Sequence, residues 1–198
     1  MKGPLHYQTS EYDCVPTTFL NAITYLYERD AIPPVVIRYI YLYSLDTVGR
    51  HGRLGRGGTS SEAIRLLGHW LGRYKTRKFA VATQYLQGSD VHLRRGNKIT
   101  ACLGAGGVAL CNIHPIRSDW HYVLALKARK DTLLFFDPYW RLSVRGLRGH
   151  VELPRSDSPR APNLAVARGW LDANTDRRRF CFGTTRNREC LLMWRKRP

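Results

Sequence analysis

The sequence has few acidic residues and no long apolar segment. Its 198 residues include 15 Asp and Glu against 32 Lys and Arg, which gives a formal net charge of +17. The apolar runs are shorter than the roughly 20 residues that a transmembrane helix needs. The segment 1–8 is short and polar, without the apolar stretch of a secretory signal. We therefore expect no transmembrane segment and a cytoplasmic location.

The number of cysteines is odd. The five residues Cys14, Cys102, Cys111, Cys181 and Cys190 are spread along the chain. They do not pair evenly, so we expect reduced, buried thiols and no disulfide framework. Their spacing matches no zinc motif, and we expect neither a metal nor an organic cofactor. Across a hairpin, Cys181 and Cys190 are predicted to face each other.

The positive charge attracts polyanions, anionic lipid surfaces and acidic peptides without distinguishing among them. Basic residues, mostly Arg, occur in every segment rather than in one patch. The sequence contains no helix-turn-helix, zinc-finger or RNP-type pattern, which disfavours nucleic acid as the partner. The oligomeric state cannot be inferred from these features.

Hydrophobic spacing divides the chain into helices followed by strands. A first helix is predicted from Cys14, with Ser10 or Asp13 as its cap and apolar residues at i, i+3 and i+4. Further helices are expected over 35–45 and from a capping-box pattern at 59–62, separated by a glycine-rich loop at 47–58. A short strand or link is predicted at 79–82, followed by a polar helix or loop at 83–95. Buried strands are predicted at 107–113, 121–128 and 132–137. Near the C-terminus, 179–183 and 189–195 are expected to form a hairpin.

This order predicts the α+β class, with N-terminal helices packed on one antiparallel sheet. The length fits a single domain, residues 1–198. We divide it into a core at 5–140 and a C-terminal part at 141–198, which consists of a loop insertion and the hairpin extension.

Four residues have the chemistry of a nucleophilic site. At a helix start, the Cys14 thiol lies where the helix dipole and free N–H groups favour a thiolate. His121 begins a strand, after a predicted turn at Arg117-Ser118-Asp119, and Asp137 ends the next strand. If these strands form a hairpin, Asp137 can hydrogen-bond and orient the His121 base. With the Cys14 backbone N–H, the Gln8 amide can form an oxyanion hole. His114 is an alternative base.

Together these residues resemble the C39 peptidase and C39-like group of papain-like cysteine peptidases. The resemblance rests on Gln8 six residues before Cys14, on 58–60 opening a helix, on 120–124, and on 136–138, and it covers roughly residues 5–140. It implies a papain-like fold, with Cys14 as nucleophile, His121 as base, Asp137 as orienter and Gln8 in the oxyanion hole.

The resemblance implies a cysteine peptidase or amide hydrolase that acts on a peptide or protein substrate, and the basic surface favours an acidic peptide. An acyltransferase with the same acyl-enzyme is an alternative. Another alternative is an inactive peptide-binding module. The family usually has Gly after the cysteine, whereas this chain has Val15, whose side chain is expected to crowd the substrate backbone.

Overall fold

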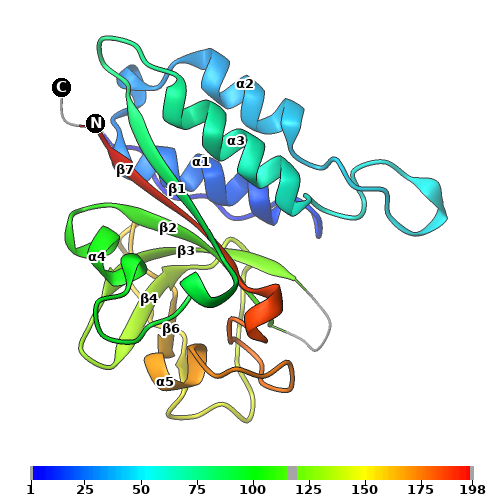
Figure 1. The fold of residues 1–198 in the computed structure, drawn as a ribbon, viewed down its shortest axis with the longest axis vertical. Helices are drawn as coiled ribbons and strands as arrows, with labels where there is room; N and C mark the ends of the chain where they lie inside the picture. The colour runs from blue at the N-terminus through cyan, green and yellow to red at the C-terminus, as the bar shows by residue number, and fades with distance from the viewer. Residues whose placement is uncertain (1, 116–119, 197–198) are drawn as a thin grey trace.

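The computed structural model describes residues 2–115 and 120–196. In this part of the chain, seven strands form one antiparallel sheet in the order β1-β7-β2-β3-β4-β6-β5 (Figure 1). The strands are β1 Val81–Gln87, β2 Val108–Ile113, β3 His121–Ala128, β4 Thr132–Phe136, β5 Val151–Glu152, β6 Leu164–Ala167 and β7 Glu189–Arg195. The helices are α1 Cys14–Leu26, α2 Pro34–Tyr43, α3 Ser61–Arg73, α4 Lys98–Gly104 and α5 Arg168–Leu171.

Two apolar cores lie on opposite faces of this sheet. One core joins the sheet to α1, α2 and α3, which lie together in Figure 1. On the opposite face, the second core includes Ile99 and Leu103 of α4 and Leu171 of α5. The predicted α+β class, with N-terminal helices packed on an antiparallel sheet, is confirmed.

Helix α1 forms where the sequence predicts it because its apolar residues recur on one face. Phe19, Ile23 and Leu26 are almost fully buried against the sheet. Pro16 lies in the first turn, where its missing N–H costs no hydrogen bond. The buried face thus fixes the orientation of the helix against the sheet, and with it the position of the first residue, Cys14.

Helix α3 begins at the predicted cap. The Ser60 hydroxyl accepts a hydrogen bond from the backbone N–H of Ala63 at 3.1 Å. In turn, the Asp46 carboxylate accepts from the Ser60 backbone N–H at 2.8 Å and from its hydroxyl at 2.5 Å. This arrangement ties the start of α3 to the far end of the loop before it.

Two sequence predictions about β structure are wrong. Residues 83–87 are not a polar helix or loop, because they continue β1 and pair with β7. Residues 179–183 form no hairpin with 189–195, since β7 pairs instead with β1 and β2. The last strand therefore lies inside the sheet, between β1 and β2, and forms no C-terminal hairpin extension.

The strands that carry the candidate base and its orienter form the predicted meander. β2 pairs with β3, and β3 pairs with β4, each in antiparallel register. His121 begins β3, opposite Ile113, and Asp137 directly follows the last residue of β4. Both side chains thus come to one end of the sheet. The predicted turn at Arg117-Ser118-Asp119 lies outside the described residues.

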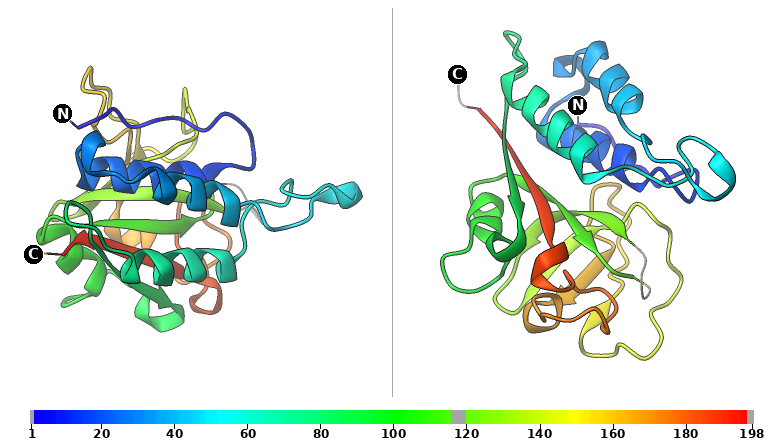
Figure 2. Two further views of the ribbon diagram at one scale, coloured as in Figure 1. Left: turned by 90° about the horizontal axis from the view of Figure 1, so that it is seen from above. Right: turned by 45° about the vertical axis from the view of Figure 1, so that its right-hand side comes forward.

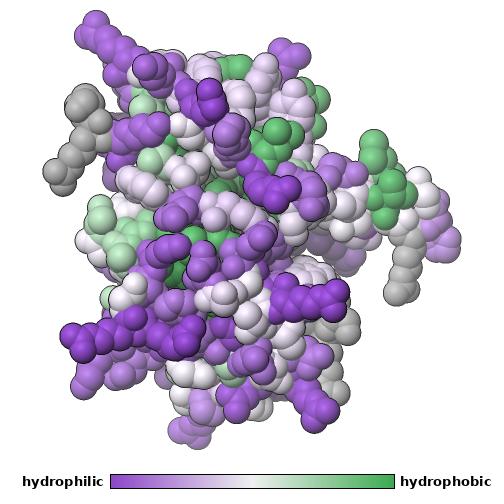
Figure 3. Space-filling view, viewed as in Figure 1, coloured by the Kyte–Doolittle hydropathy of each residue, from purple (hydrophilic) through white to green (hydrophobic). Residues whose placement is uncertain are grey.

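The predicted glycine-rich loop projects from the body of the protein in both views of Figure 2. An isolated bridge joins Val48 and Leu54, whose side chains are 59% and 76% exposed. Figure 3 shows a mainly hydrophilic face with apolar residues near this projection. Among the described residues, no helix combines the length and the apolar character required to cross a membrane.

The Ser60→Ala variant is expected to lose about 1 kcal/mol of unfolding free energy, since it removes the N-cap of α3. Urea denaturation measures this loss. Ser143→Ala is the matched control, because Ser143 is exposed in a loop. Equal stability of the two variants would contradict a capping role for Ser60.

Candidate active site

Cys14 is the first residue of α1, where the sequence predicts it. Its side chain is 9% exposed, and the unpaired N–H groups of the helix start surround this position. The positive end of the dipole of this 13-residue helix lies at this position. The local backbone thus provides a site suited to a nucleophilic sulfur.

The segment before Cys14 is fixed by Asp13. Asp13 occupies the N-cap position but makes no side-chain cap bond. Instead, its carboxylate accepts hydrogen bonds from the backbone N–H groups and the hydroxyls of Thr9 and Ser10, at 2.9 to 3.1 Å. Burial would raise the pKa of Asp13, but these hydrogen bonds lower it below its ordinary value. A charged Asp13 therefore holds the turn between Gln8 and Cys14.

His121 and Asp137 form a buried pair at the end of the sheet. His121 Nε2 lies 2.6 Å from Asp137 Oδ1, and the two residues are 7% and 1% exposed. The contact occupies Nε2 and leaves Nδ1 as the second ring nitrogen. This is the His–Asp hydrogen bond that the hairpin argument predicts.

The environment of His121 favours the imidazolium. Burial alone would lower its pKa, but the charge of Asp137 and the hydrogen bond to it raise the pKa. A hydrogen-bonding interaction with Cys14 and the charge of its sulfur add to this effect, and the resulting pKa is about 9. The structure therefore brings Cys14, His121 and Asp137 together.

Asp137 has further partners that the sequence analysis did not identify. Arg141 Nε donates to Asp137 Oδ2 at 2.6 Å, and the Tyr139 backbone N–H donates to Oδ1 at 2.8 Å. The Arg141 guanidinium also lies over the rings of Tyr139 and Phe180. Burial would raise the pKa of Asp137, but the contacts with His121 and then Arg141 lower it. The only sequence signal for Arg141 is its position four residues after Asp137.

Gln8 lies beside this pair through its backbone, since its N–H donates to the Pro138 carbonyl at 2.9 Å. Its amide nitrogen donates to the Ser10 carbonyl at 2.7 Å, and its Oε1 is buried without a hydrogen-bond partner in the described part of the chain. The amide has a second N–H. A role of Gln8 in an oxyanion hole remains a prediction.

Val15 does not stand where it was expected to crowd a substrate. Its side chain is 1% exposed and belongs to the core between α1 and the sheet. The side chain is thus not exposed at the protein surface, where a substrate would bind.

The other candidate residues have different surroundings. The ring of His114, the alternative base, lies against Trp120, with 4.8 Å between the ring centroids.

All five cysteines are free and buried. The predicted facing of Cys181 and Cys190 is wrong: Cys190 Sγ lies 3.5 Å from Cys111 Sγ on the neighbouring strand. Within 2–115 and 120–196, no three His, Cys, Asp or Glu side chains cluster as metal ligands would.

No protein-family model matches this sequence, and no curated protein is significantly similar to it.

The Arg141→Gln variant is expected to raise the pKa of Asp137 toward its ordinary value, because it removes a cation from beside the carboxylate. His121 remains in contact with the carboxylate and limits this rise. A ¹³C NMR titration of the carboxyl groups measures this shift. Arg145→Gln removes the same charge from an exposed position in the same loop, and an equal shift in this control would contradict a specific contact.

Proposed function

We propose that the protein is a papain-like, C39-like cysteine peptidase or amide hydrolase. The observation that carries this proposal is the buried hydrogen bond of 2.6 Å between His121 and Asp137, with Cys14 close enough to raise the pKa of the histidine. A thiol at the start of the first helix, opposite a His–Asp pair on the sheet, suits acyl transfer.

In the first half of the reaction, the Cys14 sulfur forms a bond to the carbonyl carbon of the substrate. The negative charge moves to the carbonyl oxygen, which the Cys14 backbone N–H and the second N–H of Gln8 would stabilise. His121 then gives its proton to the leaving nitrogen, and the C–N bond breaks. The products of this step are a free amine and a thioester on Cys14.

In the second half, His121 takes a proton from water as the water oxygen attacks the thioester carbon. The C–S bond breaks, the acid leaves, and the thiolate returns beside the imidazolium. Through both halves, Asp137 holds the ring through Nε2 and leaves Nδ1 for the exchange of protons. Arg141 and the Tyr139 N–H hold Asp137. This chemistry requires no metal and no organic cofactor.

The proposal predicts that an activated ester, such as a p-nitrophenyl ester of a short peptide, acylates Cys14. Intact-mass spectrometry should detect the thioester in the wild-type protein and no adduct in Cys14→Ala. Analysis of the product, with and without an added amine, separates hydrolysis to the acid from transfer to the amine. Absence of acylation with such an activated carbonyl would contradict the proposal.

Gln8→Ala is expected to slow acylation by about 10²–10³-fold, the effect of losing one oxyanion donor. Gln84→Ala is the matched control, because Gln84 is exposed on β1. Circular dichroism establishes that both variants fold. If both acylate at the wild-type rate, Gln8 has no part in the oxyanion hole.

A further inference from the structure

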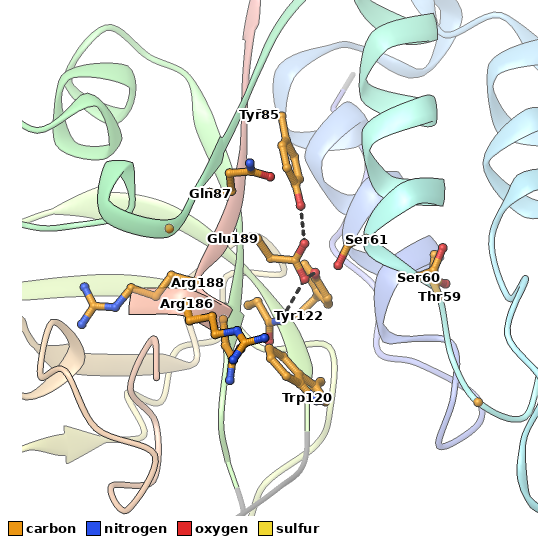
Figure 4. A pocket seen from close by; sticks show the side chains of 14 residues that line it. Thr59, Ser60, Ser61, Tyr85, Gln87, Trp120, Tyr122, Arg186, Arg188 and Glu189 are labelled. Carbon is orange, nitrogen blue, oxygen red and sulfur yellow. Dashed lines mark hydrogen bonds between the residues drawn. The ribbon is translucent and has the colours of Figure 1, made fainter. Parts of the chain in front are cut away.

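A second feature lies beside the candidate active site, at the end of the sheet. A pocket of about 520 Å³ opens between the start of α3 and the ends of β1, β2, β3 and β7 (Figure 4). Its lining includes Ser61, Tyr85, Asn112, Tyr122 and Glu189. These residues carry no functional signal in the sequence, since they come together only in the folded sheet and at the start of α3.

The pocket contains a buried carboxylate that accepts hydrogen bonds from three side chains. The hydroxyls of Tyr85 and Tyr122 both donate to Glu189, as Figure 4 shows. Asn112 Nδ2 donates to Glu189 Oε1 at 3.1 Å. Glu189 is 7% exposed. Three donors point at one carboxyl group, as they do around a carboxylate. These bonds leave lone-pair capacity for a further donor.

No cation of the described chain neutralises this carboxylate through a salt bridge. Arg188 lines the pocket, but its guanidinium bonds to Asp172 Oδ1 at 2.6 Å and to the carbonyls of Val91 and Gly183. Arg186 is exposed at the rim. A buried negative charge without a paired cation is costly, and a cationic ligand would offset that cost.

Asn112, which lines the pocket, has an acceptor atom that makes no hydrogen bond within the described residues. This atom is Oδ1, and Asn112 is 2% exposed. Since its Nδ2 already donates to Glu189, the amide is held with Oδ1 as an acceptor. A ligand with several N–H donors can satisfy Asn112 and Glu189 together.

The position of the pocket connects it to Cys14. Trp120 and Tyr122, which flank His121 in the sequence, both line it. The Tyr122 carbonyl accepts a hydrogen bond from Thr18 Oγ1, one turn of α1 beyond Cys14, at 3.1 Å. Burial is the main cause of the raised pKa of Tyr122, the charge of Glu189 adds to it, and the charge of the Cys14 sulfur is a smaller cause.

We propose that this pocket is a substrate subsite that binds an ammonium or guanidinium group, such as a Lys or Arg side chain, with Glu189 and Asn112 as its acceptors. The inference rests on the proposed function, because it places the cationic group on the substrate of Cys14. The pocket would then prefer a cationic group, whereas the basic surface of the protein attracts anionic ones. The net charge of +17 acts at long range and is screened by salt, whereas Glu189 acts at contact.

The test uses two series of chloroacetamides on the wild-type protein. One series derives from α,ω-diaminoalkanes and ends in an ammonium group, and the other derives from n-alkylamines and ends in a methyl group. Chain lengths are matched from short to long, and mass spectrometry follows alkylation of Cys14. We expect the cationic reagents to react at least about tenfold faster at one chain length, as one charge-assisted hydrogen bond would give.

The two proposals fail in different ways. If the neutral reagents alkylate Cys14 readily and the cationic ones gain nothing at any length, the cationic subsite is wrong and the reactive thiol stands. If no reagent of either series alkylates Cys14 faster than an unfolded control, the proposed function fails. This comparison needs no variant, so it does not depend on the stability of an altered pocket.

Glu189→Gln should remove the preference for the cationic reagents over the neutral ones of the same chain length. Glu152→Gln is the matched control, because it changes the net charge equally at an exposed position on β5. A preference that persists in Glu189→Gln, or that disappears equally in Glu152→Gln, would overturn the assignment.

Discussion

The hydrogen bond between His121 and Asp137 is the interaction on which the rest of the site depends. Both side chains are buried, and each offsets part of the cost of burying a charge on the other. The contact joins the start of β3 to the end of β4 and sets which ring nitrogen is left for Cys14. Arg141, Tyr139 and Asn163 then fix the Asp137 end of the pair, the last through a bond of 2.6 Å to the Asp137 backbone N–H.

The same pair links stability to pH. The pKa of His121 is raised from 6.5 to about 9 in the folded protein. Its contribution to stability is therefore fully present below pH 6.5 and is lost as the pH rises through about 9. The interaction with Cys14 also raises the pKa of His121. The geometry that would activate the sulfur therefore also stabilises the fold around it.

Local signals made part of the fold and site predictable. The first helix, the Ser60 cap and the meander from β2 to β4 depend on residues close together in sequence, and the meander brings His121 to Asp137. Residues 83–87 were misassigned because their partner is β7, about 100 positions away, and their own alternation is weak. The Glu189 pocket and the Cys111–Cys190 contact could not be predicted for the same reason, since both depend on the pairing of β7 with β1 and β2.

Whether His121 and Asp137 activate Cys14 is measured by the pH dependence of Cys14 alkylation by iodoacetamide. Mass spectrometry follows the reaction in wild type, His121→Ala and Asp137→Asn. The buried thiols of Cys102 and Cys190, whose pKa values are raised by burial, serve as internal controls. We expect rapid alkylation of Cys14 near pH 7 and loss of this reactivity in both variants. Alkylation of Cys14 at the rate of an ordinary thiol, unchanged in His121→Ala, would contradict a functional pairing of the two residues.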